Sequence, residues 1–400
     1  MKKYCLYLSL FLCLSLPSQA QELSIRLEKA ESLSEYISDE QRYNTSHLCI
    51  SGPIGGKDIK LLRAMAGGGF NEMESSQGIL EHLDLSQAQI VESDIPYYCM
   101  GNNFYTKANT LGTFMFYNCR QLKSIILPKN LISIEYAAFS YSKIDSLHIP
   151  ESIEQIQTTA FEKAEQLQNI FVKANNQYYQ DVDGVVFSKD LSTLVFFPCG
   201  RTDSYNIPQT CAQLAANAFH GSQLSKVQLS SNINEIPEMA FYEAHIRYIY
   251  LHEGIRQIGQ SAFSQCPYLE SIYLPASIQR LDYRAFSFLP QLKSVYIAAN
   301  EPPSCNQAFE GSFDKDPILH VPYGCIENYL PANGYNFGAF SRIREYSPTG
   351  MNPLTTHQTN NAYYRLDGSV AQSNSTGILI IRQADGSTIK VLQARGAGGK

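Results

Sequence analysis

Tryptophan is absent from this sequence, and charge is sparse, since Asp, Glu, Lys and Arg make up 17% of the 400 residues. The 31 basic residues are outnumbered by 37 acidic ones, for a net charge of −6. This balance argues against nucleic acid as the main partner, because nucleic-acid binding needs a dense basic surface. Beyond the first 20 residues, no apolar run approaches the roughly 18 residues of a membrane-spanning helix. The apolar fraction of 44% nevertheless provides a packed core and excludes wholesale disorder.

Motifs of the common catalytic and metal sites are also missing. No GxSxG, HExxH, Walker or GxGxxG pattern occurs, and no Cys/His cluster has zinc spacing. His252-Glu253 lacks the second histidine of a zinc protease. Asp181-x-Asp183-Gly184 lacks the remaining ligands of a calcium loop, so it is interpreted as a turn. We therefore expect no enzyme activity, no metal site and no cofactor.

The first 20 residues have the organisation of a signal peptide. Two lysines precede an apolar segment over 4–16, and small residues follow at 18–20. We expect cleavage after Ala20, which leaves Gln21 as the first residue of a secreted or surface protein. Lipidation at Cys13 is an alternative, disfavoured by the bulky Leu12 before it.

Eight cysteines remain after this segment. An exported protein can form disulfides, and the nearest pairs along the chain are Cys199 with Cys211 and Cys305 with Cys325. The alternative is that these cysteines are small buried hydrophobic residues.

Internal repetition dominates the middle of the chain. An Ala-Phe dipeptide recurs every 22 or 23 residues, apart from one gap of 58. This period is typical of leucine-rich repeats. The phenylalanines are Phe116, which follows Met115, and then Phe139, Phe161, Phe219, Phe241, Phe263, Phe286 and Phe309.

Each unit reads Leu-x-x-Ile-x-Leu-Pro-x-x-Ile-x-x-Ile-x-x-x-Ala-Phe, as in 122–139. The Ile-x-Leu alternation predicts a short strand with one buried face, and the proline ends its ladder. Stacking then buries columns of apolar residues that one coil cannot bury alone. Cys119 and Cys266 share one slot of the repeat, which predicts core thiols. We therefore expect an irregular α/β solenoid of leucine-rich repeats with coils of about 22–23 residues.

The remaining segments complete the predicted organisation. The 58-residue gap holds one period plus a β-hairpin at 178–198. Residues 21–79 form an N-terminal segment and cap: apolar residues from Ile25 to Ile37 recur at helical spacing, and a second helix is expected over Asp58–Ala66, ended by Gly67. The solenoid covers 80–346, a polar linker 347–362, and a small β module 363–400.

These repeats resemble the surface leucine-rich-repeat family typified by the BspA adhesin, which is common in Bacteroidetes. The resemblance rests on the Leu-Pro strand ends, the Phe-x-x-Cys slots, the Ala-Phe pairs and the hairpin sequence from Asp183 to Ser188, and it covers about Leu80 to Tyr346. The C-terminal module resembles the sorting domain of type IX secretion at 366–368, 377–378 and 390–391. Ser369 and the extra tail at 393–400 depart from that pattern, and a plain β appendage is the alternative.

The strands also predict a candidate binding surface. The residue between the two buried positions of each strand points outward. Three successive tyrosines occupy this slot, which suits contact with proteins or glycans. The alternative is that aromatic residues there merely stabilise cross-strand packing. The outward residues are Ile126, His148, Phe171, Gln228, Tyr250, Tyr273, Tyr296 and His320, with Tyr248 beside them.

The resemblance and the repeats together predict an exported, non-enzymatic, adhesin-like protein. Its partners would be host or bacterial surface proteins or glycans, engaged through the strand face. A structural component of a cell-envelope complex is the alternative, and a hydrolase with an unrecognised site is a weaker one.

Overall fold

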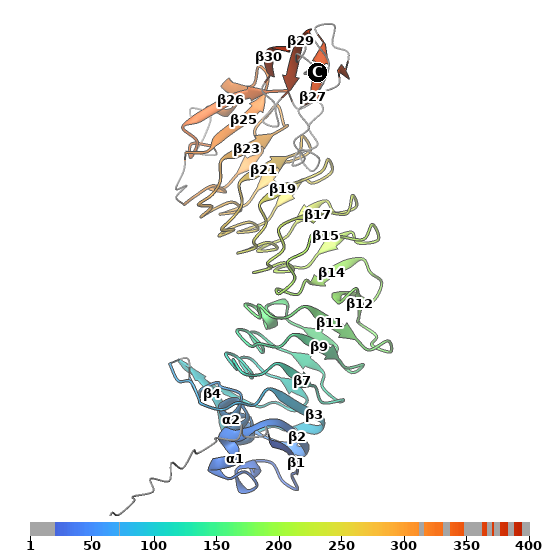
Figure 1. Ribbon diagram of the computed structural model, residues 1–400, viewed down its shortest axis with the longest axis vertical. Coiled ribbons are helices and arrows are strands. Elements are labelled where there is room, and N and C mark those ends of the chain that lie inside the picture. The colour runs from blue at the N-terminus through green and yellow to red at the C-terminus, as the bar shows by residue number, and fades with distance from the viewer. Residues whose placement is uncertain are drawn as a thin grey trace, which may run out of the picture.

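The fold is a long stack of short strands, seen in a computed structural model. The structure describes residues 21–71, 73–311, 316–330, 337–347, 362–365, 370–371, 377–382 and 388–393. Figure 1 shows the coils following one another along the long axis of the molecule. The chain is a β-solenoid of about 13 coils with a spacing of about 24 residues. The expected leucine-rich-repeat solenoid is therefore confirmed. The expected signal peptide and most of the linker lie outside the described residues.

One side of the solenoid carries the strands that the Ile-x-Leu pattern predicts. Neighbouring strands pair in parallel, in groups of two to five strands. Their inward residues, such as Ile125, Leu147 and Ile272, are buried. The strands are β1 (Gln21–Arg26), β2 (Thr45–Ile54), β3 (His82–Ile90), β7 (Ser124–Ile126), β9 (Ser146–Ile149), β11 (Asn169–Val172), β15 (Tyr205–Asn206), β17 (Val227–Gln228), β19 (Tyr248–Tyr250), β21 (Ser271–Leu274), β23 (Ser294–Ile297), β25 (Ile318–Pro322) and β26 (Arg342–Tyr346).

A second side carries two-residue strands, formed by the second Ile-x-x-Ile of each unit. They also pair in parallel from coil to coil. These strands are β6 (Thr110–Leu111), β8 (Ser133–Ile134), β10 (Gln155–Ile156), β16 (Gln213–Leu214), β18 (Glu235–Ile236), β20 (Gln257–Ile258), β22 (Arg280–Leu281) and β24 (Ser304–Cys305).

The Ala-Phe pairs form the third side, where backbone and side chain repeat together. The Phe241 N–H donates to the Ala262 carbonyl of the next coil at 2.8 Å, and the Phe263 N–H donates to the Ala285 carbonyl at the same distance. The phenylalanine rings stack nearly parallel, with centroids 4.7 Å apart for Phe219 and Phe241. The small alanine lets the coils approach closely enough for both contacts. A 3-10 turn, η2 (Thr158–Phe161), occurs on this side.

The N-terminal segment extends the first side of the solenoid. The expected helix is wrong at its start, because 21–26 is strand β1, which pairs in parallel with β2. Only a 3-10 turn, η1 (Leu33–Glu35), and a short helix, α1 (Asp39–Asn44), follow. The second expected helix is confirmed as α2 (Gly56–Met65). Gly67 follows it with a positive φ of 83°, so this glycine ends the helix as predicted.

The hairpin insertion interrupts the stack and divides its core. It consists of β12 (Tyr179–Val182), β13 (Val185–Ser188) and β14 (Thr193–Phe196), with a tight turn at Asp183-Gly184. β14 pairs in parallel with β16, so it supplies the second side of one coil. Two hydrophobic clusters meet here: Val186 packs in the N-terminal cluster and Phe187 in the C-terminal one.

Three further features complete the chain. A hairpin of β4 (Pro96–Met100) and β5 (Asn102–Tyr105) projects beside α2, as Figure 1 shows for β4. The 3-10 turn η3 (Ile326–Tyr329) follows the last full coil. A four-stranded antiparallel sheet at the C-terminus contains β27 (Ala362–Arg365), β28 (Val370–Ala371), β29 (Gly377–Arg382) and β30 (Thr388–Gln393), ordered β28-β27-β29-β30.

Candidate functional site

Outward residues of the first side lie opposite one another wherever their strands pair. Strand pairing places His148 opposite Phe171. It also places Tyr250 opposite Tyr273, and Tyr273 opposite Tyr296. We call the outward residues of these strands the strand-face column. Pairing adds residues that sequence reasoning missed: Asp84 lies opposite Ile126, Asn206 opposite Gln228, and Arg344 opposite His320.

The N-terminal part of the column is open to solvent. Ile126 and Phe171 are among the exposed large hydrophobic side chains of the described chain, and His148 is exposed between them. The rings of His148 and Phe171 stack with centroids 5.1 Å apart. Three successive coils therefore expose a small apolar and aromatic patch.

The C-terminal part of the column is more enclosed than its sequence suggests. Tyr250 and Tyr273 are half-buried, whereas Tyr296 is only 4% exposed. The Tyr296 ring stacks on Tyr273 at 4.6 Å and on His320 at 4.2 Å, and Tyr346 meets it edge-on at 5.5 Å. The expectation of an exposed Tyr296 does not hold, because its neighbours cover both faces and one edge of the ring.

Burial controls the chemistry of these tyrosines. Burial and the neighbouring Tyr296 raise the pKa of Tyr273 above its ordinary value. Burial and Glu270 likewise raise the pKa of Tyr248, which is half-buried beside the column. Both phenols therefore keep their protons at neutral pH.

Between the two aromatic parts, the column is polar. Gln228 is exposed opposite the exposed Asn206, on the short strand pair β15 and β17. The hairpin insertion separates this pair from β11, so Phe171 and Gln228 are not on adjacent strands. The column thus contains two separate aromatic patches. The N-terminal patch consists of Ile126, His148 and Phe171, and the C-terminal patch consists of Tyr250, Tyr273 and Tyr296.

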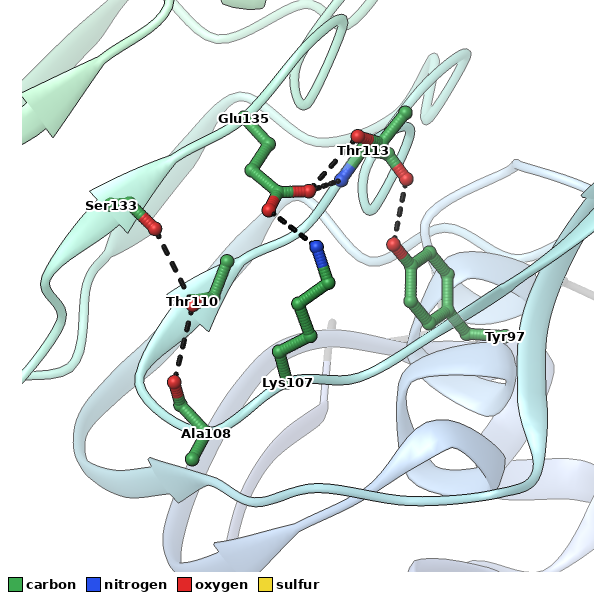
Figure 2. A network of polar contacts seen from close by, with 7 residues as sticks. All are labelled: Tyr97, Lys107, Ala108, Thr110, Thr113, Ser133 and Glu135. Carbon is green, nitrogen blue, oxygen red and sulfur yellow. Dashed lines mark hydrogen bonds and ion pairs between the residues drawn. The ribbon is translucent and has the colours of Figure 1, made fainter.

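A second polar arrangement, missed at the sequence level, lies between the N-terminal cap and the first coils (Figure 2). The Glu135 carboxylate accepts hydrogen bonds from the Thr113 N–H at 3.1 Å and from the Thr113 hydroxyl at 3.0 Å. It also pairs with the Lys107 ammonium at 2.9 Å. Burial alone would raise the pKa of Glu135, but these hydrogen bonds outweigh it and hold the pKa below its ordinary value. No sequence motif signals this contact, because the three residues come from two coils.

Six of the eight described cysteines are buried, whereas Cys49 and Cys99 are half-buried. Cys119 and Cys266 are fully buried, as their shared slot predicts. Cys199, Cys211 and Cys325 carry free thiols, so neither of the two nearest pairs is bridged. Burial raises the pKa of the Cys119 thiol to about 11, which makes it a poor nucleophile at neutral pH.

No group of three or more His, Cys, Asp or Glu side chains in the described part of the chain could hold a metal ion. Among the same residues, no helix is both long and apolar enough to cross a membrane.

Comparison with solved structures shows the same architecture in other bacterial proteins. The pneumococcal vaccine antigen PcpA has 20% sequence identity and a TM-score of 0.53, with 82% of this chain and 84% of that chain covered. A leucine-rich repeat protein from Eubacterium ventriosum has 18% identity and a TM-score of 0.50, with 77% and 83% covered. At these identities the likeness establishes the fold alone. Among curated proteins, none matches the chain.

The sequence pattern itself matches one family model. The model describes the BspA-type leucine-rich repeat region and matches six copies over 97–187 and 189–314, which is more than half of the chain. The matched residues include both aromatic patches of the strand-face column up to Tyr296. The chain belongs to the family of BspA-type leucine-rich-repeat proteins.

Proposed function

We propose that this protein is an exported, non-enzymatic, adhesin-like protein that binds surface macromolecules through its strand-face column. The observation that carries the proposal is the exposed patch of Ile126, His148 and Phe171 on three successive coils. A solenoid converts a repeated outward slot into a continuous surface. Aromatic side chains in such a surface supply apolar contact area at a small cost in conformational entropy.

A protein partner fits this surface better than a glycan. A sugar ring packs on the open face of an aromatic ring. The rings of His148 and Phe171 stack on each other, and so do those of Tyr273 and Tyr296. Each stack covers the ring faces between its members, which reduces the open ring face available to a sugar and leaves ring edges and the tyrosine hydroxyl groups for contact. These edges suit the side chains and backbone groups of a protein.

The binding test uses residues that can change without loss of the core. Tyr296→Ser would remove a covered ring and confuse folding with binding. The double change Phe171→Ser and Tyr250→Ser removes one half-buried or exposed ring from each patch instead. Loss of such anchors commonly costs more than about 1 kcal/mol of binding free energy. We expect the double variant to lose at least about fivefold in affinity for a partner found on an array of extracellular-matrix proteins and glycans.

The matched control is Gln228→Ser, which changes an exposed side chain of the same column outside both patches. It should keep the affinity of the unchanged protein. Equal affinity in the double variant and the control would move the site away from the strand face. A glycan as the sole ligand on the array would keep the site but contradict the protein partner.

Export is the second part of the proposal, together with the division into signal peptide 1–20, N-terminal cap 21–79, solenoid 80–346, linker 347–362 and C-terminal module 363–400. The support comes from the charged and apolar segments at the N-terminus. Protein recovered from outside the cytoplasm should begin at Gln21, as read by N-terminal sequencing. Recovery of protein that retains 1–20, confined to the cytoplasm, would contradict export.

A further inference from the structure

A groove of about 610 Å³ opens where the N-terminal cap meets the first coils. It is lined by the chain between β3 and β6, by Thr113 just after β6, and by Glu135, which follows β8. This lining includes the β4–β5 hairpin and not the outward residues of the strand-face column. The groove is therefore a separate surface from the one proposed above.

The charge of this groove is negative. Glu92 and Asp94 line it, are both exposed, and make no ion pair with any described residue within 4.0 Å. Lys107 is the one cation among the lining residues, and its ammonium already pairs with Glu135 at 2.9 Å. Figure 2 shows the Lys107 side chain reaching Glu135. The carboxylates of Glu92 and Asp94 are thus available to bind a cationic ligand.

Aromatic rings and an unused hydroxyl complete the lining. Tyr105 is exposed at the end of β5, and Phe104 beside it is half-buried. The face of an aromatic ring attracts a cation, most strongly where water is excluded. Thr106, which also lines the groove, is only 1% exposed, and its hydroxyl has no hydrogen-bond partner in the described structure. A buried hydroxyl without a partner costs stability. This one is closed to solvent, so a ligand group supplies its missing bond only when the side chain turns toward the groove.

We infer that this groove binds a basic side chain, an arginine above all, from an extended segment of a partner protein. The planar guanidinium can lie on an aromatic ring while its N–H groups donate to Glu92 and Asp94. Lysine offers a compact ammonium that cannot do both at once, so arginine is preferred. The volume accommodates one such side chain with part of its backbone.

The test uses the full chain and a fluorescent peptide of alternating arginine and glycine, followed by anisotropy at low and at physiological salt. The double change Glu92→Gln and Asp94→Asn keeps the shape of both side chains and removes both charges. We expect it to weaken peptide binding roughly five- to tenfold, because each exposed charge contact contributes modestly. Tyr105→Leu, which keeps an apolar side chain and removes the ring, should weaken binding about two- to threefold.

The matched control is Glu151→Gln with Glu154→Gln, two exposed carboxylates on a neighbouring coil. It makes the same change in net charge and should leave the affinity unchanged. Peptides with lysine in place of arginine should bind more weakly, and peptides with glutamate should not bind. An equal loss in the two double variants, or no binding of the arginine peptide to the unchanged protein, would overturn the inference. Neither result would contradict the strand-face proposal, because that proposal is tested with variants at Phe171, Tyr250 and Gln228.

Discussion

Replacing Phe241 with alanine is expected to lower the free energy of unfolding by about 3–5 kcal/mol. The ring is fully buried and lies between Phe219 and Phe263, with centroids 4.7 Å and 5.0 Å away. Truncation removes both stacking contacts and leaves a cavity. The cavity cannot close easily, because hydrogen bonds between successive coils, such as Phe241 N–H to the Ala262 carbonyl, fix the backbone on either side.

Urea unfolding followed by circular dichroism measures this loss. Phe288→Ala is the matched control, since it truncates the same residue type two coils further on, where the ring is 43% exposed. Its expected cost is below about 1 kcal/mol. Similar losses in both variants would mean that the stacked column does not carry the stability of the solenoid.

The repeat period made this column predictable, because each apolar slot recurs at the same distance from Phe. The backbone path around it was not predictable. Met239 and Glu243, two residues on either side of Phe241, have left-handed φ values of 51° and 55°. Neither residue type signals such a conformation, which usually favours glycine. The stacking of successive coils imposes this backbone conformation. It cannot be predicted from the sequence of a single coil.

The candidate site shows the same division between local and long-range information. Alternation within one strand identified the outward slot of Tyr296 correctly. The cover over that slot comes from Tyr346, which is brought close only by the pairing of β25 with β26. At the N-terminus, apolar residues at 25, 27, 33 and 37 fit both helical and strand periods over short stretches. Pairing with β2 makes 21–26 a strand, whereas Leu33 lies in the turn η1.

The second large effect is expected at Arg63, whose side chain is 1% exposed. Burial lowers the pKa of its guanidinium, and no described carboxylate lies within 4.0 Å. Carbonyl oxygens replace a counter-ion: Nη1 donates to Phe114 at 2.7 Å and to Met115 at 3.0 Å, while Nη2 donates to Gly69 at 2.9 Å. The guanidinium also lies over the Tyr98 ring, 4.3 Å from its centroid. One side chain thus fastens α2 to the first coil.

Arg63→Met keeps an apolar stem but removes the donors to three carbonyl groups, of which only that of Phe114 retains another, the Tyr117 N–H at 3.1 Å. We therefore expect a loss of about 3–5 kcal/mol in unfolding free energy. Arg63→Lys should recover only a small part, because an ammonium cannot reach carbonyls on both sides at once. The loss should appear first as faster amide hydrogen exchange in α2, since the cap detaches before the coils separate. Arg26→Met is the control: its side chain is 80% exposed and pairs with Glu28 at the surface, so its cost should stay within about 0.5 kcal/mol. If both methionine variants unfold alike, with unchanged exchange in α2, the buried arginine does not hold the cap to the solenoid.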